Sequence, residues 1–380
     1  MNNIRVLVVD DSSLMRRSIS KILESAPDIT VIATASNGQE AVELARKLRP
    51  DVITMDVIMP VMDGLAALKE IVKQTGSRVI MLSSETYEGS KQTIEALSAG
   101  AVDYITKTSG QVSLDIGKIS NQLINKVRTA HKSKTMVFEP ISSASYKFRQ
   151  IVAELSSREK PSIRENLLDP LTSPVKREIV AIASSTGGPA ALQVVLSALP
   201  RDLPAGIVIV QHLTEGFSQT LADKLDSVSS LDVRLCSGMD DVKPGVALLA
   251  PAGCHVTIKR MGERLLAVLG PDPENSLHKP SADVMFSSVA HTCANRSCAV
   301  ILTGMGDDGA QGIKEIKERG GVTIAQNEAT SVIFGMPKAA IEKGAIKIVA
   351  PLGEIAARIM AALITDKVPE PPNRPNLAWL

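Results

Sequence analysis

The sequence predicts an α/β protein with two doubly wound parallel-sheet domains joined by a linker. Three observations support this prediction. The chain has 380 residues, which is two or three domains' worth of sequence. Short Val- and Ile-rich runs alternate with stretches of helical period in two separate regions, residues 1–128 and 177–367. Aromatic residues make up only 2% of the chain, so the cores must be built from aliphatic side chains, as suits α/β layers.

Five strand-like runs make up the first predicted domain, residues 1–128. They are RVLVVD, TVIATAS, PDVITMD, RVIMLSS and VDYITK. Helix-like stretches such as GQEAVELARKL and KQTIEALSAG lie between them. Five such βα units are enough for one open parallel sheet.

The same alternation returns in the second predicted domain, residues 177–367, with the runs REIVAIAS, AGIVIVQH, CAVILTG and GGVTIAQN. Between the domains, residues 129–176 contain many serines, four prolines and no sustained apolar period. This composition predicts a linker, with one short helix near residues 146–155. Residues 368–380 contain four prolines and predict a tail without regular structure.

Charge and composition exclude several classes of protein. Lys and Arg number 42 against 41 Asp and Glu, so the net charge of +1 argues against a non-specific nucleic-acid or membrane-surface binder. The first residues lead directly into a strand and no apolar stretch reaches about 18 residues, so we expect a cytoplasmic protein without membrane insertion. The four cysteines lack disulfide or zinc spacing, and we expect them to be buried. They are Cys236, Cys254, Cys293 and Cys298.

Polar residues end four strands of the first domain, at the edge where parallel sheets bind ligands. Asp10 and Asp11 end the first strand, Asp56 the third, Ser83 the fourth and Lys107 the fifth. Clustered carboxylates repel one another unless a hard cation neutralises them, and Mg²⁺ is the candidate. Asp56 could then attack a phosphodonor and form an acyl phosphate that Mg²⁺, Lys107 and the Ser83 hydroxyl stabilise.

The motifs VLVVDDS, DVITMDVIMPVMDG and DYITK resemble a response-regulator receiver domain over residues 4–125. The resemblance implies a flavodoxin-like fold, with Asp56 as the phosphorylated residue and Mg²⁺ as the cofactor of phosphorylation. The implied roles are Mg²⁺ ligation by Asp10, Asp11, Asp56 and the Ile58 carbonyl, and a phosphate-sensing switch of Ser83, Tyr104 and Lys107. The sequence departs from the family at Thr108, where proline is usual.

Two adjacent serines follow the first strand of the second domain, in the turn ASSTGGP before a helix-like stretch. A strand, a sharp turn of small residues and a helix form the setting of a nucleophile elbow. Ser185 fits it better than Ser184, because the small residues Ala183 and Gly187 flank Ser185 at positions minus two and plus two. The pair Gly187-Gly188 at a helix start could instead bind phosphate, and this segment alone leaves both interpretations open.

The residues at two other strand ends favour the nucleophile elbow over the phosphate-binding turn. His212 follows AGIVIVQ, and Asp307 and Asp308 follow AVILTG, so a parallel sheet would bring serine, histidine and aspartate to one edge. Acyl transfer needs this set, because imidazole accepts the hydroxyl proton and a carboxylate orients the imidazole. We interpret the remaining four histidines as structural or exposed. They are His131, His255, His278 and His291.

The motifs ASSTGGP, VQHL, KPSADVMF and LTGMGDDG resemble the catalytic domain of the chemotaxis protein-glutamate methylesterases, over residues 178–365. Receiver, linker and catalytic domain follow in the order of the full-length family. The resemblance implies Ser185 as nucleophile, His212 as base and Asp308 as orienting carboxylate, with no cofactor for the ester chemistry. It implies chemoreceptor γ-methyl glutamates as substrate, receptor glutamines as a second substrate, and a chemotaxis-type histidine kinase as phosphodonor.

The sequence departs from this family at three places. Ala183-Ser184 stands where Gly-Ala is more common, Asp307 where Asn or another residue is usual, and Ala282 in place of a common valine. The first two departures place a second hydroxyl and a second carboxylate beside the expected catalytic ones.

The oxyanion donors are the least defined part of the expected site. We assign them to the backbone N–H of Thr186 and to groups near Met305 or Gly306. As regulation, we expect the unphosphorylated receiver to block access to Ser185, and phosphorylation of Asp56 to weaken that block.

Three alternative functions belong to other classes of protein. A DNA-binding output domain is disfavoured, because the second region has no basic helix-turn-helix stretch. A receiver-controlled scaffold with an inactive hydrolase-like domain stays open, because side chains 1 Å out of place would not catalyse. A hydrolase of small soluble esters is disfavoured by the receiver domain.

Overall fold

The computed structural model describes residues 3–84, 87–107, 116–133, 177–271, 273 and 276–364. These residues form two parallel sheets, and each sheet together with the helices that connect its strands makes up one unit. Thr108, the predicted helix near residues 146–155, nearly all of the predicted linker and the predicted tail lie outside the described residues. No helix in the described part of the chain combines the length and the apolar character needed to cross a bilayer.

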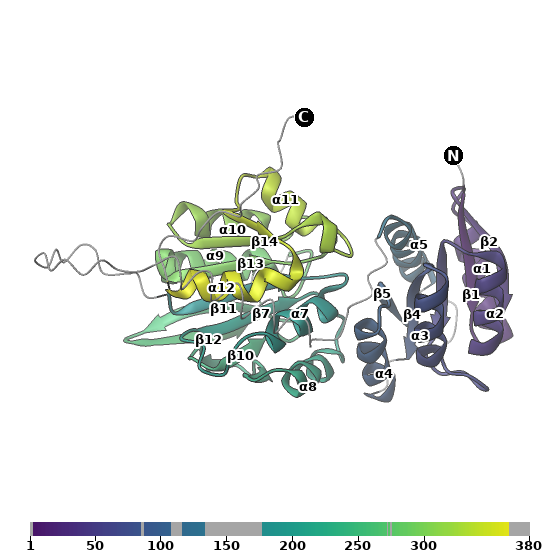
Figure 1. Cartoon of the computed structure of the whole chain (residues 1–380), viewed down its shortest axis with the longest axis horizontal. Coiled ribbons are helices and arrows are strands. Elements are labelled where there is room, and N and C mark those ends of the chain that lie inside the picture. The colour runs from purple at the N-terminus through teal and green to yellow at the C-terminus, as the bar shows by residue number, and fades with distance from the viewer. Residues whose placement is uncertain are drawn as a thin grey trace, which may run out of the picture. The chain divides into compact units, whose positions relative to one another are not determined.

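The first unit is a five-stranded parallel sheet with the strand order β2-β1-β3-β4-β5 (Figure 1). Its strands are β1 (Ile4–Val9), β2 (Ile29–Ala35), β3 (Val52–Asp56), β4 (Arg78–Ser84) and β5 (Asp103–Lys107). Its helices are α1 (Ser13–Glu24), α2 (Gly38–Leu48), α3 (Gly64–Gln74), α4 (Tyr87–Ser98) and α5 (Ile116–Lys132). This strand order is that of flavodoxin-like sheets, as predicted.

Local sequence sets the helix starts in this unit. Ser12, Asn37 and Asp63 each accept a hydrogen bond from the backbone amide three residues further on, at the starts of α1, α2 and α3. Such caps satisfy amide groups that have no partner inside the helix. The interior strand β1 is buried from Val6 to Val9, which explains why it appears in the sequence as one continuous apolar run.

The second unit is a seven-stranded parallel sheet with the order β15-β14-β13-β6-β7-β10-β8. From β6 the chain first adds strands on the β7 side and later on the β13 side, so the strand order reverses at β6. Open α/β sheets bind ligands at such a reversal. The strands are β6 (Ile179–Ser184), β7 (Gly206–Gln211), β8 (Asp232–Leu235), β10 (Val246–Leu249), β13 (Ser297–Ile301), β14 (Val322–Gln326) and β15 (Ile348–Ala350).

Both faces of this sheet are covered. Ile179, Ala181 and Ala183 of β6 belong to a core that includes Phe286 of α9, whereas Val180 and Ile182 point to the opposite face and are equally buried. The helices are α7 (Gly188–Ser197), α8 (Ser218–Val228), α9 (Ala282–Cys293), α10 (Ala310–Glu318), α11 (Met336–Glu342) and α12 (Ile355–Ile364). Short 3₁₀ turns are formed by η1 (Ala294–Arg296), η2 (Glu328–Thr330) and η3 (Leu352–Glu354). The predicted fold class, two doubly wound parallel-sheet domains, is confirmed.

One feature of this unit was not predicted. β9 (Met239–Asp241), β11 (His255–Met261) and β12 (Arg264–Gly270) form a small antiparallel sheet in the order β11-β12-β9. Met261 pairs with Arg264, so β11 and β12 are joined by a two-residue turn that begins at Gly262. Gly262 has a positive φ of 59°, which such hairpin turns require and glycine adopts readily. β11 also contacts α9, which makes the hairpin part of the core.

Candidate active site

The acidic residues predicted in the first unit lie together. Carboxylate oxygens of Asp10, Asp11 and Asp56 lie within 4.8 Å of one another. The Lys107 ammonium lies 2.8 Å from Asp10 Oδ2 and 2.6 Å from Asp56 Oδ2. Three carboxylates and one ammonium leave two negative charges among hard oxygen donors. This set of donors fits Mg²⁺.

Burial and ion pairing act against each other in this cluster. Burial raises the pKa of the Asp56 carboxyl, although the Lys107 ammonium opposes the shift. Burial alone would lower the pKa of Lys107, but the Asp56 and Asp10 carboxylates outweigh it and raise that pKa. Lys107 is therefore charged at neutral pH and directed at the carboxylate that was predicted to be phosphorylated.

The other predicted receiver residues surround this cluster. Ser83 is buried directly after Leu82, the partner of Asp56 in the pairing of β3 with β4, and its hydroxyl donates to the Gly89 carbonyl at 3.2 Å. Tyr104 is buried on β5, which raises the pKa of its hydroxyl to about 12. Ile58 follows β3 and is half exposed, and its backbone N–H donates to Asp56. Their roles in phosphorylation stay predictions.

In the second unit, the predicted base and carboxylate form a hydrogen bond. His212 Nε2 lies 2.7 Å from Asp308 Oδ2, and the two side chains are 10% and 11% exposed. The other ring nitrogen, Nδ1, is buried and has no hydrogen-bond partner among the described residues. Because an ionised Asp308 accepts the Nε2 proton, we assign the acceptor lone pair to Nδ1. A general base needs such a nitrogen.

The amino terminus of α9 holds Asp308 in place. Its carboxylate accepts from the Ser281 hydroxyl at 2.8 Å and from the amides of Ala282 and Asp283 at 2.7 and 3.0 Å. Burial opposes ionisation of Asp308, but His212 and these amides together hold the pKa of Asp308 well below its ordinary value. Asp308 is therefore an anion at neutral pH. Asp307 is exposed, so the structure favours Asp308 as the orienting carboxylate.

Ser185 follows β6, the strand that lies between the strands leading to His212 and Asp308. The His212 amide donates to the Ser184 carbonyl at 3.1 Å, which joins the ends of β6 and β7. The Ser184 side chain is fully buried, and its hydroxyl donates to Gln211 Oε1 at 2.6 Å. Ser185 is partly exposed. Of the two hydroxyls, Ser185 is thus the one that solvent reaches.

The turn after Ser185 has the geometry of a strand-to-helix elbow. The Gly188 amide donates to the Ser185 carbonyl at 2.7 Å, and α7 begins at Gly188. Gly187 has a φ of +77°, a left-handed conformation that a side chain would strain. Thr186 is partly exposed in this turn, and Met305 and Gly306 are exposed in the loop that leads to Asp308. The oxyanion role of these three residues stays a prediction.

His278 contributes to this site although the sequence indicated only a structural or exposed role. Its ring stacks on the His212 ring, with centroids 4.3 Å apart and planes 14° apart. Burial lowers the pKa of His278, and the neighbouring His212 lowers it further. The available signal was its position three residues before Ser281, which caps α9 and binds Asp308.

Of the remaining histidines, His255 reaches this pair indirectly, through Ser281, whose hydroxyl donates to Asp308. His255 is fully buried on β11, where Nδ1 accepts from the Ser281 amide at 3.2 Å, and His291 is exposed on α9. His131 is exposed at the end of α5. The four cysteines are free, and burial raises the pKa of three of them to about 12. Cys254 is only partly buried, which differs from our expectation.

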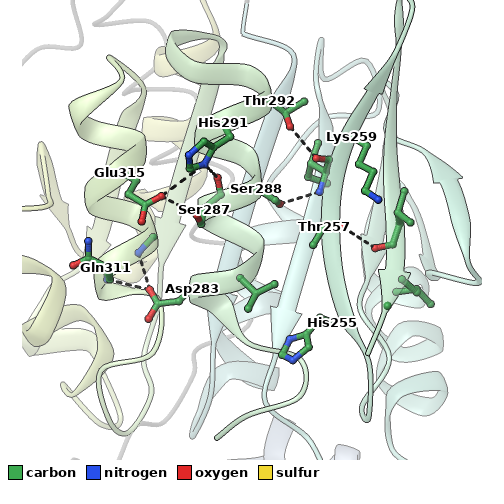
Figure 2. A pocket seen from close by; sticks show the side chains of 16 residues that line it. His255, Thr257, Lys259, Asp283, Ser287, Ser288, His291, Thr292, Gln311 and Glu315 are labelled. Atoms are coloured by element: carbon green, nitrogen blue, oxygen red, sulfur yellow. Dashed lines mark hydrogen bonds and ion pairs between the residues drawn. The ribbon is translucent and has the colours of Figure 1, made fainter. Parts of the chain in front are cut away.

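A cavity of about 730 Å³ lies between the β11–β12 hairpin and the helices α9 and α10 (Figure 2). Ser185, His212 and Asp308 do not line it. Figure 2 shows the Asp283 carboxylate accepting from the amides of Gln311 and Gly312, at 3.0 and 2.7 Å, at the start of α10. The first turn of α9 is thus tied to α10, and this tie steadies the amides that bind Asp308.

Two family models match the chain. The model described as CheB methylesterase matches residues 180–359, and the response regulator receiver domain matches residues 6–115. The chain is similar to a protein-glutamate methylesterase/protein-glutamine glutaminase of Methanococcoides burtonii, with 45% identity over 359 residues, 94% of this chain and 97% of that protein. A protein of the same name from Geobacillus kaustophilus is 42% identical, over 95% of this chain and 99% of its own length. The crystal structure of the Thermotoga maritima CheB methylesterase catalytic domain is 38% identical, covering 49% of this chain and 98% of that one, with a TM-score of 0.48.

Proposed function

The chain belongs to the CheB methylesterase family and carries a response regulator receiver domain, and from this we propose that it hydrolyses γ-methyl glutamate side chains of chemoreceptors to glutamate and methanol. The family resemblance predicted from the motifs is thereby confirmed. The names of the relatives also support deamidation of receptor glutamines. The observation that carries the catalytic assignment is the His212–Asp308 hydrogen bond beside the elbow that holds Ser185.

In the acylation step, the Ser185 hydroxyl attacks the ester carbonyl while His212 Nδ1 accepts its proton. The resulting imidazolium keeps its Nε2 proton on Asp308, whose negative charge stabilises it. The tetrahedral intermediate then expels the methoxy group, which leaves as methanol with the proton from Nδ1. The backbone N–H of Thr186 and groups near Met305 or Gly306 would stabilise the oxyanion.

In the second step, water attacks the acyl-enzyme by the same route. His212 Nδ1 takes a proton from the water and returns it to Ser185, which leaves a receptor glutamate. An amide passes through the same tetrahedral intermediate, so a glutamine would lose ammonia where the ester loses methanol.

The receiver unit would control this chemistry through Asp56. The Asp56 carboxylate attacks the phosphorus of a kinase phosphohistidine, and the bond from phosphorus to the imidazole nitrogen breaks. Mg²⁺, held by Asp10, Asp11, Asp56 and the Ile58 carbonyl, would neutralise the phosphoryl oxygens when bound. Lys107 pairs with Asp56 and would pair with the phosphoryl group, while Ser83 and Tyr104 respond to it.

The test is methanol release from methylated receptor membranes. We expect Ser185→Ala to abolish turnover, because it removes the hydroxyl that attacks the ester carbonyl. The matched control is Ser184→Ala, which removes a neighbouring buried hydroxyl and should leave turnover nearly normal. Full activity in Ser185→Ala would overturn the assignment of the nucleophile.

A further inference from the structure

The stacked pair His212 and His278 is not explained by the steps above. The rings lie nearly parallel, and no hydrogen bond joins them. His278 comes from the loop before α9, whereas His212 follows β7. Two imidazole rings from separate segments thus pack face to face, and one of them, His212, is the general base of the proposed reaction.

We propose that His278 is a positioning residue whose stacked ring holds the His212 ring in the plane in which Nε2 donates to Asp308 and Nδ1 remains the acceptor. A single hydrogen bond, here between Nε2 and Asp308, directs one N–H but leaves the ring free to rotate about that line. A flat partner 4.3 Å away removes this freedom. The effect of His278 on catalysis rests on the proposed function. The stacking of the two rings is independent of that function.

The neighbouring charges determine which protonation state of His278 can hold the His212 ring in position. His212, Asp307 and Asp308 are the charged or titratable groups that act on it. Burial and His212 lower the pKa of His278 and outweigh the two carboxylates, which raise it. His278 is therefore neutral at pH 7, and a neutral ring can lie on the imidazolium that forms at His212 during acylation. Once His278 is protonated at lower pH, it would repel that imidazolium.

The first experiment tests the stacking of His278 on His212 by NMR and does not depend on catalytic activity. The ring resonance of His278 is followed by NMR as a function of pH in the full-length chain and is assigned by its loss in His278→Phe. We expect its midpoint below the ordinary value of about 6.5, and we expect His212→Gln to raise it, because the neighbouring charge that lowers the pKa of His278 is gone. As a control, His291→Gln removes an exposed histidine and should leave the midpoint unchanged. An unchanged midpoint in His212→Gln would refute the stack.

The second experiment separates positioning from mere packing. In methanol release, His278→Ala should lower kcat by about tenfold or more with little change in KM, because a misplaced base slows the chemical step. His278→Phe keeps a flat ring and should recover most of the lost kcat. It should also remove the loss of activity that protonation of His278 causes at low pH, because phenylalanine carries no charge. Equal kcat values for the Ala and Phe variants, or full activity of the Ala variant, would contradict the proposal.

The two arms fail in different ways. If Ser185→Ala retained activity, the proposed nucleophile would be wrong, yet the NMR midpoint would still report on the ring stack. If the NMR arm succeeded and the kinetic arm failed, the rings would stack without positioning the base, and the inference alone would fall.

Discussion

At the scale of single residues, neighbouring side chains of the same type differ in the groups that they contact. Asp307 and Asp308 are neighbours in one loop, but only Asp308 reaches the amides at the start of α9 and the His212 ring. Ser184 and Ser185 differ in the same way, since Ser184 is fully buried and donates to Gln211 whereas Ser185 is partly exposed. A residue becomes reactive here through its surroundings.

The two aspartates can be compared directly. Asp308→Asn should lower kcat by about 10³- to 10⁴-fold, because an amide would favour the wrong tautomer of His212. KM should change little. Asp307→Asn, at an exposed position, should retain activity within about twofold. Steady-state kinetics of methanol release on both variants provides the measurement, and equal losses in the two would contradict the choice of Asp308.

At the scale of elements, helix starts and tight turns do much of the positioning. The first turn of α9 supplies two amides and a hydroxyl to Asp308, while α10 supplies two amides to Asp283 in that same turn. Charges at helix amino termini are favourable because unpaired amides point toward them. The strand-to-helix turn at Gly187 places Ser185 between β6 and α7, with the Gly188 amide donating to the Ser185 carbonyl.

The strand-to-helix turn at Gly187 can be tested by substitution, with Gly344 as the control position. Gly187→Ala places a side chain at φ +77°, which should cost about 1–2 kcal/mol of stability. It should also displace Ser185 and lower kcat by about tenfold or more. Gly344→Ala, at φ +67° with open space around it, should cost similar stability and leave kcat unchanged. Thermal unfolding and methanol release measure the two effects, and normal kcat in Gly187→Ala would argue against the elbow.

At the scale of the whole molecule, the same architectural rule places a polar cluster in each of the two units. Each unit has its polar cluster at the carboxyl ends of a parallel sheet, one suited to phosphoryl transfer and the other to acyl transfer. Coupling between them needs little energy, since relieving a tenfold block takes about 1.4 kcal/mol.

Regulation is tested on the chain and on its second half. Asp56→Asn should have basal methanol release but no stimulation by a small phosphodonor, because the acceptor carboxylate is gone. A fragment that begins at residue 177 should be active without phosphodonor, and Ser185→Ala in the same fragment gives its background rate. If the fragment were no faster than the unphosphorylated chain, inhibition by the receiver would have to be abandoned.

The sequence by itself determined the two parallel sheets and the residues at their strand ends. Asp10, Asp56, His212 and the pair Asp307 and Asp308 could be predicted because an apolar run is recognised from local pattern, and parallel strands bring all their carboxyl ends to one edge. The cluster of carboxylates around Lys107 followed from the same rule.

Only the tertiary structure decided how side chains and loops meet within that edge. The ring stack of His278 on His212, the inward turn of Ser184, the selection of Asp308 by α9 and the β11–β12 hairpin all depend on contacts between distant segments. The position of a strand end follows from the pattern of apolar residues, which is present in a short stretch of sequence. Loop packing follows from which surfaces remain to be covered once the sheets have formed, and no local pattern records that.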